Sequence, residues 1–445
     1  MSQEPTRPAQ DPGDPNPGVL PPQTRRPGQP VAESKINAVG RSMLREMLES
    51  SWLVTLLAIV AALVLGAILI AAADAAVQET ASYFFAQPAD LFRAVGNAVG
   101  GAYSALFQGA VVNFSADGFA RMIRPITETM TVATPLILAG LGIGIGFRAG
   151  LFNIGAQGQI ILGGIFGGFV GFTFHLPVGL HLLVAVLGAA LGGAIWASIA
   201  GVLKATTGAN EVIVTIMLNN IAIYLIGFLL TTSAFRRPGG ANPISPPIRD
   251  TAIYPLLLGT GFRLHLGFIV ALVVAAGVWW LMERSTLGLR FRAVGANPHA
   301  ARTAGMSVPW ATVWVMAIAG ALAGLAGSAQ VLGTERVLTA GVAASFGFDA
   351  ITVALLGRSR PLGTVLAGLL FGGLRAGGFA MQARTGTPID IVLVVQSFIV
   401  LFIAAPPLVR AIFRLPTPGG PTRAEKRAAR DMANEPSLSA QEAGA

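Results

Sequence analysis

Uncharged polar side chains that could bind a solute lie inside two apolar stretches of the chain. They are amides and hydroxyls, which fit a neutral hydroxylated molecule better than a charged one. The members of the two groups are Asn153, Gln157, Gln159, Thr215, Asn219 and Asn220. An amide buried in an apolar medium without a partner is costly, so each must pair with a neighbouring helix or face a wet passage. Both alternatives fit these residue types.

The spacing within each group predicts shared helix faces. Asn153 and Gln157 are four residues apart, and so are Thr215 and Asn219. Residues at this spacing lie one above the other on an α-helix. We therefore expect each pair to face the same neighbour or the same passage.

Further candidates lie in the C-terminal half. Asp349 and Thr352 stand near the start of a short apolar stretch, and Gln330 ends the apolar run before it. Asp349 fits a helix N-terminal cap, or an acid that contacts hydroxyl groups at the outer mouth of a path. Arg375 lies well inside an apolar run, so it needs a partner or a wet cavity. Asp349 and Asp390 both fit as that partner.

Several kinds of chemistry are missing from the sequence. There is no G-x-x-x-x-G-K-[ST] loop, no H-E-x-x-H and no G-x-S-x-G motif, and the four histidines have no metal-ligand spacing. The chain has no cysteine, which excludes disulfides and thiolate ligands. We expect no catalytic site, no bound metal and no cofactor in this chain. Acids are scarce within the apolar runs, which disfavours proton or sodium coupling.

The composition places these side chains in a membrane. The apolar fraction is 53% and the charged fraction 11%, whereas soluble domains carry about 25% charged residues. The net charge of +9 could suggest nucleic-acid binding. The arginines, however, lie between apolar runs and in the tails, as membrane orientation requires. We therefore expect membrane lipids, and no nucleic acid, as partners.

Apolar runs long enough to cross a bilayer set the architecture. Nine full-length runs occupy residues 52–74, 126–147, 151–174, 182–204, 211–233, 264–282, 309–332, 361–381 and 389–412. A tenth stretch, 346–358, is short, and 91–112 is weaker and amphipathic. We predict an all-α polytopic membrane protein with about ten transmembrane helices, some of them short or broken.

The distribution of charged and polar residues predicts the orientation of the chain in the membrane and divides it into three regions. Basic residues precede the first run, and a basic loop spans residues 283–308, so we expect both on the cytoplasmic side. If the short tenth stretch crosses, both termini are cytoplasmic. We predict a disordered Pro-rich tail over 1–46, a membrane domain over 47–413 and a polar tail over 414–445.

Hydropathy also indicates an inverted internal repeat. Residues 126–233 and 309–412 each hold a long run, an interrupted segment and two further runs. The interrupted segments are 153–159 and 348–352. Transporters are often built from inverted repeats with interrupted helices at matching positions near the substrate.

Four stretches of sequence carry a family resemblance. They are FRAGLFNIGAQGQ from Phe147, GANEVIVTIMLN from Gly208, GLRFRAVGANPHAARTAGMSV from Gly288 and FDAITVALLGRSRPLGTVLAGLLFGGLRAGG from Phe348. The chain resembles the permease subunits of bacterial ATP-binding cassette (ABC) importers for simple sugars and nucleosides, which are related to branched-chain amino acid permeases. The resemblance covers roughly residues 47–412, and the first two stretches look most like the nucleoside branch.

The role of the basic loop can be interpreted from its residues alone or from the family resemblance. Asn297-Pro298 can start a short helix and Gly305 can end it. An anchor on the cytoplasmic side without a partner would explain the arginines. The resemblance implies instead that loop 283–308 holds the helix that receives the ATPase stroke. The residues concerned are Arg292, Gly295, Asn297, Pro298, Ala301, Arg302 and Gly305.

The resemblance implies a transporter subunit in the bacterial inner membrane. Its implied partners are an ABC ATPase subunit that binds ATP, a second permease, and an extracellular lipoprotein or periplasmic binding protein. The second permease is expected to be non-identical, with a homodimer as the alternative. Nucleosides are the first expected substrates, and simple sugars such as ribose or galactose the second. An ion-coupled secondary transporter is the alternative from another class.

Overall fold

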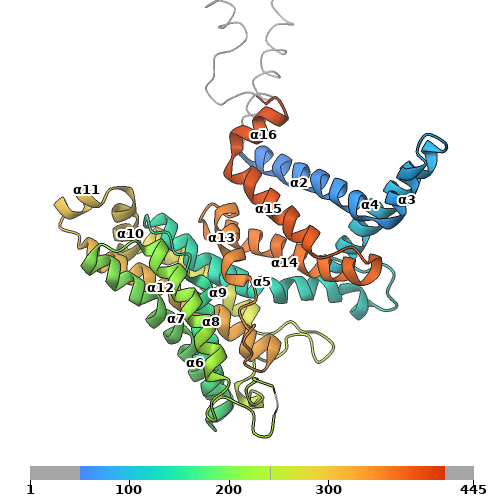
Figure 1. The fold of residues 1–445 in the computed structure, drawn as a ribbon. Helices are drawn as coiled ribbons and strands as arrows, with labels where there is room; N and C mark the ends of the chain where they lie inside the picture. The colour runs from blue at the N-terminus through green and yellow to red at the C-terminus, as the bar shows by residue number, and fades with distance from the viewer. Residues whose placement is uncertain (1–50, 241, 416–445) are drawn as a thin grey trace, which may run out of the picture. The chain divides into compact units, whose positions relative to one another are not determined.

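Helices form nearly all the regular structure in this computed structural model, which describes residues 51–240 and 242–415 (Figure 1). The helices of the first half are α2 (Ser51–Ala73), α3 (Ala75–Ser82), α4 (Pro88–Ala110), α5 (Phe119–Arg148), α6 (Ala156–Thr173), α7 (Leu180–Thr207) and α8 (Glu211–Leu229). The tails predicted over 1–46 and 414–445 lie outside the described residues, apart from residues 414 and 415.

The second half continues the helical pattern after a long loop that holds one short 3-10 turn, η1 (Asp250–Ala252). Its helices are α9 (Gly267–Arg284), α10 (Thr286–Ala296), α11 (Pro298–Thr303), α12 (Val308–Ser328), the π-helix η2 (Ala329–Glu335), α13 (Phe346–Leu356), α14 (Pro361–Thr385), α15 (Asp390–Ala404) and α16 (Pro406–Ile412). Figure 1 shows α10 and α11 extending beyond the ends of the helices that flank them.

The candidate membrane spans match the nine predicted runs one for one. Among the described residues, eight helices are long and apolar enough to cross a membrane, or nine if α15 and α16 form one bent span. That pair bends by 97° at Ala405, so the run predicted over 389–412 is not one straight helix. The all-α polytopic fold is confirmed. A tenth crossing by α13, which has only 11 residues, stays a prediction.

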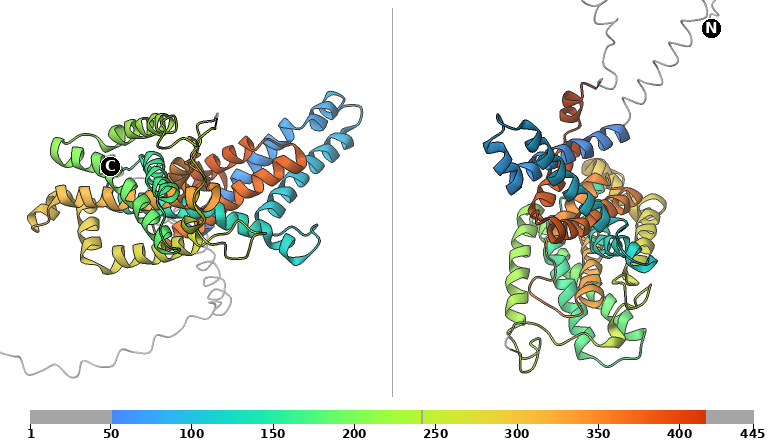
Figure 2. Two further views of the ribbon diagram at one scale, coloured as in Figure 1. Left: turned by 90° about the horizontal axis from the view of Figure 1, so that it is seen from below. Right: turned by 90° about the vertical axis from the view of Figure 1, so that its right-hand side faces the viewer.

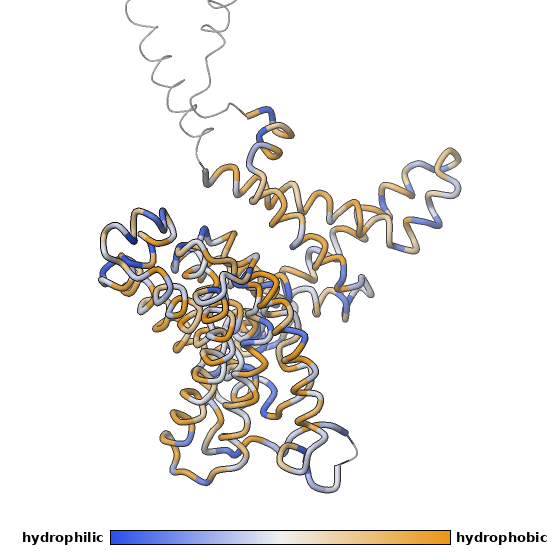
Figure 3. The backbone as a smooth tube through the Cα atoms, turned by 60° about the vertical axis from the view of Figure 1, so that its left-hand side comes forward, coloured by the Kyte–Doolittle hydropathy of each residue, from blue (hydrophilic) through white to orange (hydrophobic). Residues whose placement is uncertain are grey.

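Burial separates a central group of helices from a peripheral one. Helices α5, α6 and α12 are buried along most of their length, whereas only 28% of the apolar stretch in each of α2, α7 and α8 is buried. The exposed side chains of α7 and α8 are mostly leucine, isoleucine and valine, as expected for a surface in contact with lipid. Figure 3 shows this apolar colouring along the helices, with polar residues gathered in the connecting segments.

Small residues let the central helices approach closely, which explains the abundance of glycine. A Cβ atom on Gly193 of α7 would lie 2.1 Å from the carbonyl oxygen of Gly320 in α12. A Cβ atom on Gly163 of α6 would lie 2.4 Å from Gly324 of α12. Membrane helices commonly pack through such small-residue contacts. Helix α12 therefore fits against both α6 and α7 only because these positions lack side chains.

The N-terminal and C-terminal helices pack together on another part of the molecule. Helix α4 packs against α14, and α2 meets α15 where a Cβ atom on Gly66 would lie 2.5 Å from Val395 Cγ2. Both views in Figure 2 show the blue N-terminal helices beside the red C-terminal ones.

The order of elements recurs in the two predicted halves. In each half a long buried helix, α5 or α12, is followed by an interruption, a second helix and two further helical segments. The first interruption follows Gly150, whose φ of +72° ends α5 in the left-handed region that favours glycine. The second spans η2 and the loop before α13. The recurring order supports an internal repeat, while its inverted symmetry stays a prediction.

Candidate functional site: two cavities beside the central helices

Two neighbouring cavities lie where α5, α14 and the loop before α9 meet. The larger, the arginine-rich cavity, has a volume of about 490 Å³ and is lined by Arg121, Arg124, Arg263, Arg384, Glu128 and Gln108 among others. The smaller, the Gln330 cavity, measures about 240 Å³ and is lined by Gln330, Thr131, Thr334, Glu335, Phe346 and Arg375 among others. Val132, Arg263 and Phe379 line both, so the two cavities adjoin.

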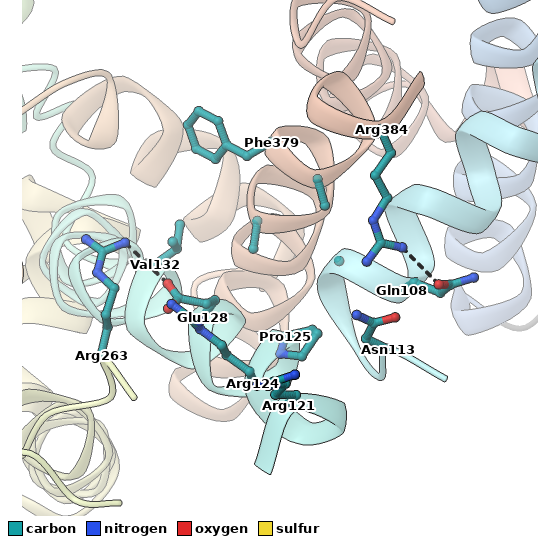
Figure 4. A pocket seen from close by; sticks show the side chains of 13 residues that line it. Gln108, Asn113, Arg121, Arg124, Pro125, Glu128, Val132, Arg263, Phe379 and Arg384 are labelled. Carbon is teal, nitrogen blue, oxygen red and sulfur yellow. Dashed lines mark hydrogen bonds and ion pairs between the residues drawn. The ribbon is translucent and has the colours of Figure 1, made fainter. Parts of the chain in front are cut away.

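An ion pair stands at the junction of the two cavities. Arg263 Nη1 lies 3.3 Å from Glu128 Oε2, and both side chains are partly exposed. Arg384 Nη1 donates to Gln108 Oε1 across the far side of the arginine-rich cavity, at 2.9 Å. Figure 4 shows Arg121 and Arg124 close together on the first turns of α5. Since exposed ion pairs contribute only about 0–1 kcal/mol, the Glu128 pair can separate at little cost.

The Gln330 cavity has an amide with no protein partner. Gln330 is 4% exposed, and its side chain makes no hydrogen bond to any described residue. It belongs to η2, and single turns of π-helix often mark functional sites. Buried amides are nearly always hydrogen-bonded, so a solvated or ligand-filled cavity must satisfy this one.

A charged cluster forms one wall of the Gln330 cavity. Arg375 Nη1 lies 3.1 Å from Asp349 Oδ2 and 3.1 Å from Ser345 Oγ. Ser345 Oγ donates to Asp349 Oδ2 at 2.7 Å. The guanidinium of Arg375 also lies over the ring of Phe346, 4.5 Å from its centroid. Of the two acids that the sequence left open, Asp349 is therefore the partner of Arg375, and it is not an N-terminal cap.

Gln157 joins the two interrupted segments. Its Nε2 donates to the carbonyl of Ala344 at 2.6 Å, and its Oε1 accepts from the amide of Gly347 at 3.0 Å. Gly347 has no room for a side chain, because a Cβ atom there would lie 2.3 Å from the amide nitrogen of Gln157. The start of α6 and the start of α13 are thus fixed to each other.

The shared face predicted for Asn153 and Gln157 is wrong. Asn153 lies in the non-helical segment before α6, because α5 ends near Gly150 and α6 begins only at Ala156. Its amide pairs twice with Gln159, at 3.0 and 3.1 Å, and accepts from the amide of Gly155 at 2.9 Å. Asn153 and Gln159 therefore satisfy each other.

Thr215 and Asn219 share a buried face of α8, as the spacing predicts. Asn219 accepts from the amide of Gly158 at 2.8 Å and donates to the carbonyl of Ile154 at 2.9 Å. Thr215 donates to the carbonyl of Glu211 in its own helix, at 2.7 Å. These bonds fit the structural alternative of contact between helices.

Asn220 and Thr352 bond locally. Asn220 is exposed and donates to the carbonyl of Ile216 in its own helix, at 3.1 Å. Thr352 donates to the carbonyl of Asp349, at 2.5 Å. Of the nine side chains predicted to line a path, Gln330 is the one that lines either of these two cavities, and it lines the smaller one. For the other eight, a part in the path stays a prediction.

The basic loop contains two short helices. Asn297 Oδ1 accepts from the amides of His299 and Ala300, at 3.0 and 3.1 Å, and so caps α11, with Pro298 at its first position. Gly305 follows α11 with a φ of +78°. These observations confirm the predicted start and end of a short helix. Within α11, Arg302 is exposed and Ala301 is buried.

Glu283 binds the basic loop to the end of α5. Its carboxylate lies 2.6 Å from Arg148 Nη2 and 3.3 Å from Arg292 Nη1. Beside this pair of contacts, a Cβ atom on Gly295 would lie 2.4 Å from the carbonyl oxygen of Arg148. The backbone of α10 therefore lies directly against the turn that follows α5.

Sequence reasoning missed several residues of these sites. Arg263, Phe346 and Phe379 are single residues without a motif, so only their position in the fold identifies them as cavity residues. Glu283 was the one acid beside a basic loop, which is a usable signal for an ion pair.

Comparisons with known proteins find a clear family likeness. Residues 126–404 match the family model described as the branched-chain amino acid transport system / permease component. The chain is 38% identical to the guanosine ABC transporter permease protein NupP of Bacillus subtilis, over 71% of this chain and 89% of that protein.

Two further relatives are similar over much of their length. The glucose ABC transporter permease protein TsgB13 of Haloferax volcanii is 36% identical, over 62% of this chain and 75% of that protein. The nucleoside ABC transporter permease protein NupB of Lactococcus lactis is 33% identical, over 63% of this chain and 79% of that protein. No solved structure matches the chain.

Proposed function

Because the chain belongs to the family of branched-chain amino acid transport permease components, we propose that it is the membrane permease subunit of an ABC importer for nucleosides. The observation that carries this proposal is the 38% identity to a permease named for guanosine, across 89% of that protein's length. The relative named for glucose favours a simple sugar as the second candidate.

The Gln330 cavity supports a nucleoside as the substrate. A nucleoside has an apolar ring face together with polar ring edges and hydroxyl groups. Phe346 and Phe379 offer apolar surfaces, while Gln330, Thr131 and Thr334 offer neutral hydrogen-bonding groups. Binding sites for small molecules commonly combine apolar walls with a few such polar groups. The adjoining arginine-rich cavity would lead the substrate to this site.

The two ends of α5 separate the roles of entry and coupling. The arginine-rich cavity lies along the first turns of α5, and Glu283 holds the basic loop at its last residue, Arg148. With a rise of 1.5 Å per residue, 30 helical residues span about 45 Å, which is enough to cross a bilayer. In this proposal the arginine-rich cavity faces the exterior, and the basic loop and both termini are cytoplasmic.

Partner subunits complete the importer. An ATPase subunit would bind ATP and contact α10 and α11, so the chain itself would hydrolyse nothing. An extracellular binding lipoprotein or periplasmic protein would deliver the substrate to the arginine-rich cavity. Two different guanosine permeases of B. subtilis, NupP and NupQ, resemble this chain, which supports a non-identical second permease. The complete importer would lie in the bacterial cell membrane, or in the inner membrane of bacteria that have two.

Uptake of labelled nucleosides by cells that express all the subunits tests this function. We expect these cells to take up the labelled nucleoside. Unlabelled guanosine or uridine should suppress this uptake, and excess ribose or galactose should leave it unchanged. A Lys→Ala change in the P-loop of the ATPase subunit should abolish it. Suppression by the sugars alone would replace the nucleoside with a sugar. Uptake that survives loss of the ATPase, and fails when ion gradients collapse, would favour a secondary transporter.

A further inference from the structure

The Gln330 cavity contains more hydrogen-bonding capacity than the protein uses. Gln330 is almost completely buried, yet neither end of its amide has a partner among the described residues. An amide offers a carbonyl acceptor next to an N–H donor. The amide is open to the cavity and is not among the polar side-chain atoms that are both sealed from solvent and unpaired. A polar ligand in the cavity can therefore replace water as its hydrogen-bonding partner.

Arg375 has unused donors in the same cavity. Its bonds to Asp349 and Ser345 both come from Nη1, and Nε and Nη2 bond to none of the described residues. The ring of Phe346 lies under the guanidinium, which restricts the plane in which the remaining donors point. A guanidinium edge presents two parallel N–H groups and therefore matches two adjacent acceptors.

Charge in the cavity excludes the common anionic partners of arginine. Asp349 already neutralises Arg375, Glu128 pairs with Arg263, and Glu335 adds a further acid to the lining. A carboxylate or phosphate would therefore gain little here and would meet the field of Glu335. The suitable ligand is a neutral group with two adjacent acceptors.

Among nucleobases, the requirement for two adjacent acceptors selects the 6-oxopurines. Guanine presents O6 and N7 as adjacent acceptors, whereas adenine pairs an acceptor with a donor and pyrimidines offer a single exocyclic group. Hypoxanthine shares the O6 and N7 atoms of guanine. In both bases N1–H lies beside O6, where an amide oxygen can accept it.

Resting on the proposed function, we propose that the Gln330 cavity recognises 6-oxopurine nucleosides. The free edge of Arg375 donates to O6 and N7 of the base, and Gln330 accepts from N1–H. Phe346 and Phe379 contact the ring. Arg375 and Gln330 are thus specificity-determining residues of this cavity, and Asp349 and Ser345 position the guanidinium.

Equilibrium binding of labelled guanosine to the purified membrane complex tests this proposal. The complex holds both permeases and the ATPase but no binding protein, so that the permease cavity alone is measured. Guanosine and inosine should compete at least about 10-fold better than adenosine and uridine, as expected for one bidentate contact. 7-Deazaguanosine, which lacks the N7 acceptor, should compete about 10-fold less well than guanosine.

Two variants test whether Arg375 and Gln330 determine the preference among bases. Arg375→Lys keeps the charge beside Asp349 but cannot offer two parallel donors, so it should weaken guanosine and inosine about 10-fold and leave adenosine unchanged. Gln330→Leu should weaken guanosine and inosine in the same selective way. Arg93→Lys, at an exposed position of α4 outside both cavities, is the matched control and should leave the preference among bases intact.

The outcomes separate this proposal from the function on which it rests. If Arg375→Lys weakens the binding of all nucleosides equally, the proposed role of the cavity is overturned, although nucleoside uptake stands. The same holds if the wild-type complex binds nucleosides without preference among bases. If the complete importer moves a sugar and no nucleoside, the proposed function fails and the base-recognition proposal fails with it.

Discussion

His265 shows how strongly the surroundings of one side chain can change its chemistry. It is 1% exposed, stacks on the ring of Tyr254 at 5.5 Å and accepts from the amide of Gly267 through Nδ1, at 3.2 Å. Burial, with a smaller contribution from Arg263 and Arg336, lowers the pKa of His265 from 6.5 to about 4. The ring is therefore neutral at physiological pH, and it packs against the π-helix that carries Gln330.

Acid should destabilise the protein through His265. A folded-state pKa of about 4, below the unfolded value of 6.5, means that the unfolded chain binds the proton first. The stabilising effect of the neutral ring is complete above pH 6.5 and is lost as the pH falls towards 4, up to about 3 kcal/mol. Thermal unfolding of the purified protein at pH 7.5 and pH 5 measures this.

A variant without the titrating ring isolates the effect. His265→Gln should be less stable than the wild type at pH 7.5 but should lose less stability on acidification. His299→Gln, at an exposed position of α11, should behave as the wild type at both pH values. An unchanged pH dependence in His265→Gln would show that another group titrates.

At the scale of elements, α5 connects the cavities to the basic loop. Glu128 and Thr131 of its N-terminal half line the cavities, and Arg148 at its C-terminal end binds Glu283. The backbone of α10 touches the turn after α5 at Gly295, where a Cβ atom would meet backbone atoms of Arg148 and Ala149 at 2.4–2.8 Å. Helix α10 therefore cannot move towards α5 without displacing its C-terminal end.

Gly295→Val should uncouple ATP hydrolysis from transport. The added side chain cannot fit against a backbone, so α10 must shift away from α5. We expect nucleoside uptake to fall at least about 10-fold, which corresponds to only about 1.4 kcal/mol, while the assembled complex still hydrolyses ATP. Uptake in cells and ATPase activity of the purified complex are measured side by side.

Gly277→Ala provides the control, because Gly277 lies on an exposed face of α9 with no atom within 4 Å of an added Cβ. It should leave both activities unchanged. If Gly295→Val transports normally, α5 is not the connection between the ATPase and the cavities.

At the scale of the whole molecule, hydropathy was sufficient for the spans but not for the site. Nine apolar runs and the capped helix at Asn297 follow from local sequence, because length, charge and capping are local properties. The cavities are not local, since they join α5, η2, α14 and the loop before α9. Arg375 could be recognised as needing a partner, but only the fold selects Asp349 over Asp390.

The amides show the same limit. Asn153, Gln157 and Gln159 were recognisable as buried polar groups, yet their partners lie at the start of α13 or within the turn before α6. The non-helical segment after Gly150 extends to residue 155, past the start of the run predicted at residue 151, and this changes which of them can share a helix face. Gln330 differs in that no other element within the described part of the chain supplies a partner for its amide.

The absence of cysteine from the sequence makes the orientation of the molecule directly measurable. Arg121 and Arg302 are both exposed arginines, one at the start of α5 and the other on α11. A membrane-impermeant maleimide added to intact cells should label Arg121→Cys and leave Arg302→Cys unlabelled until the membrane is opened. In opened membranes, the ATPase subunit should protect Arg302→Cys by covering α11. Labelling of Arg302→Cys in intact cells would place the basic loop outside, where no ATPase could reach it, and would reverse the roles of the two ends of α5.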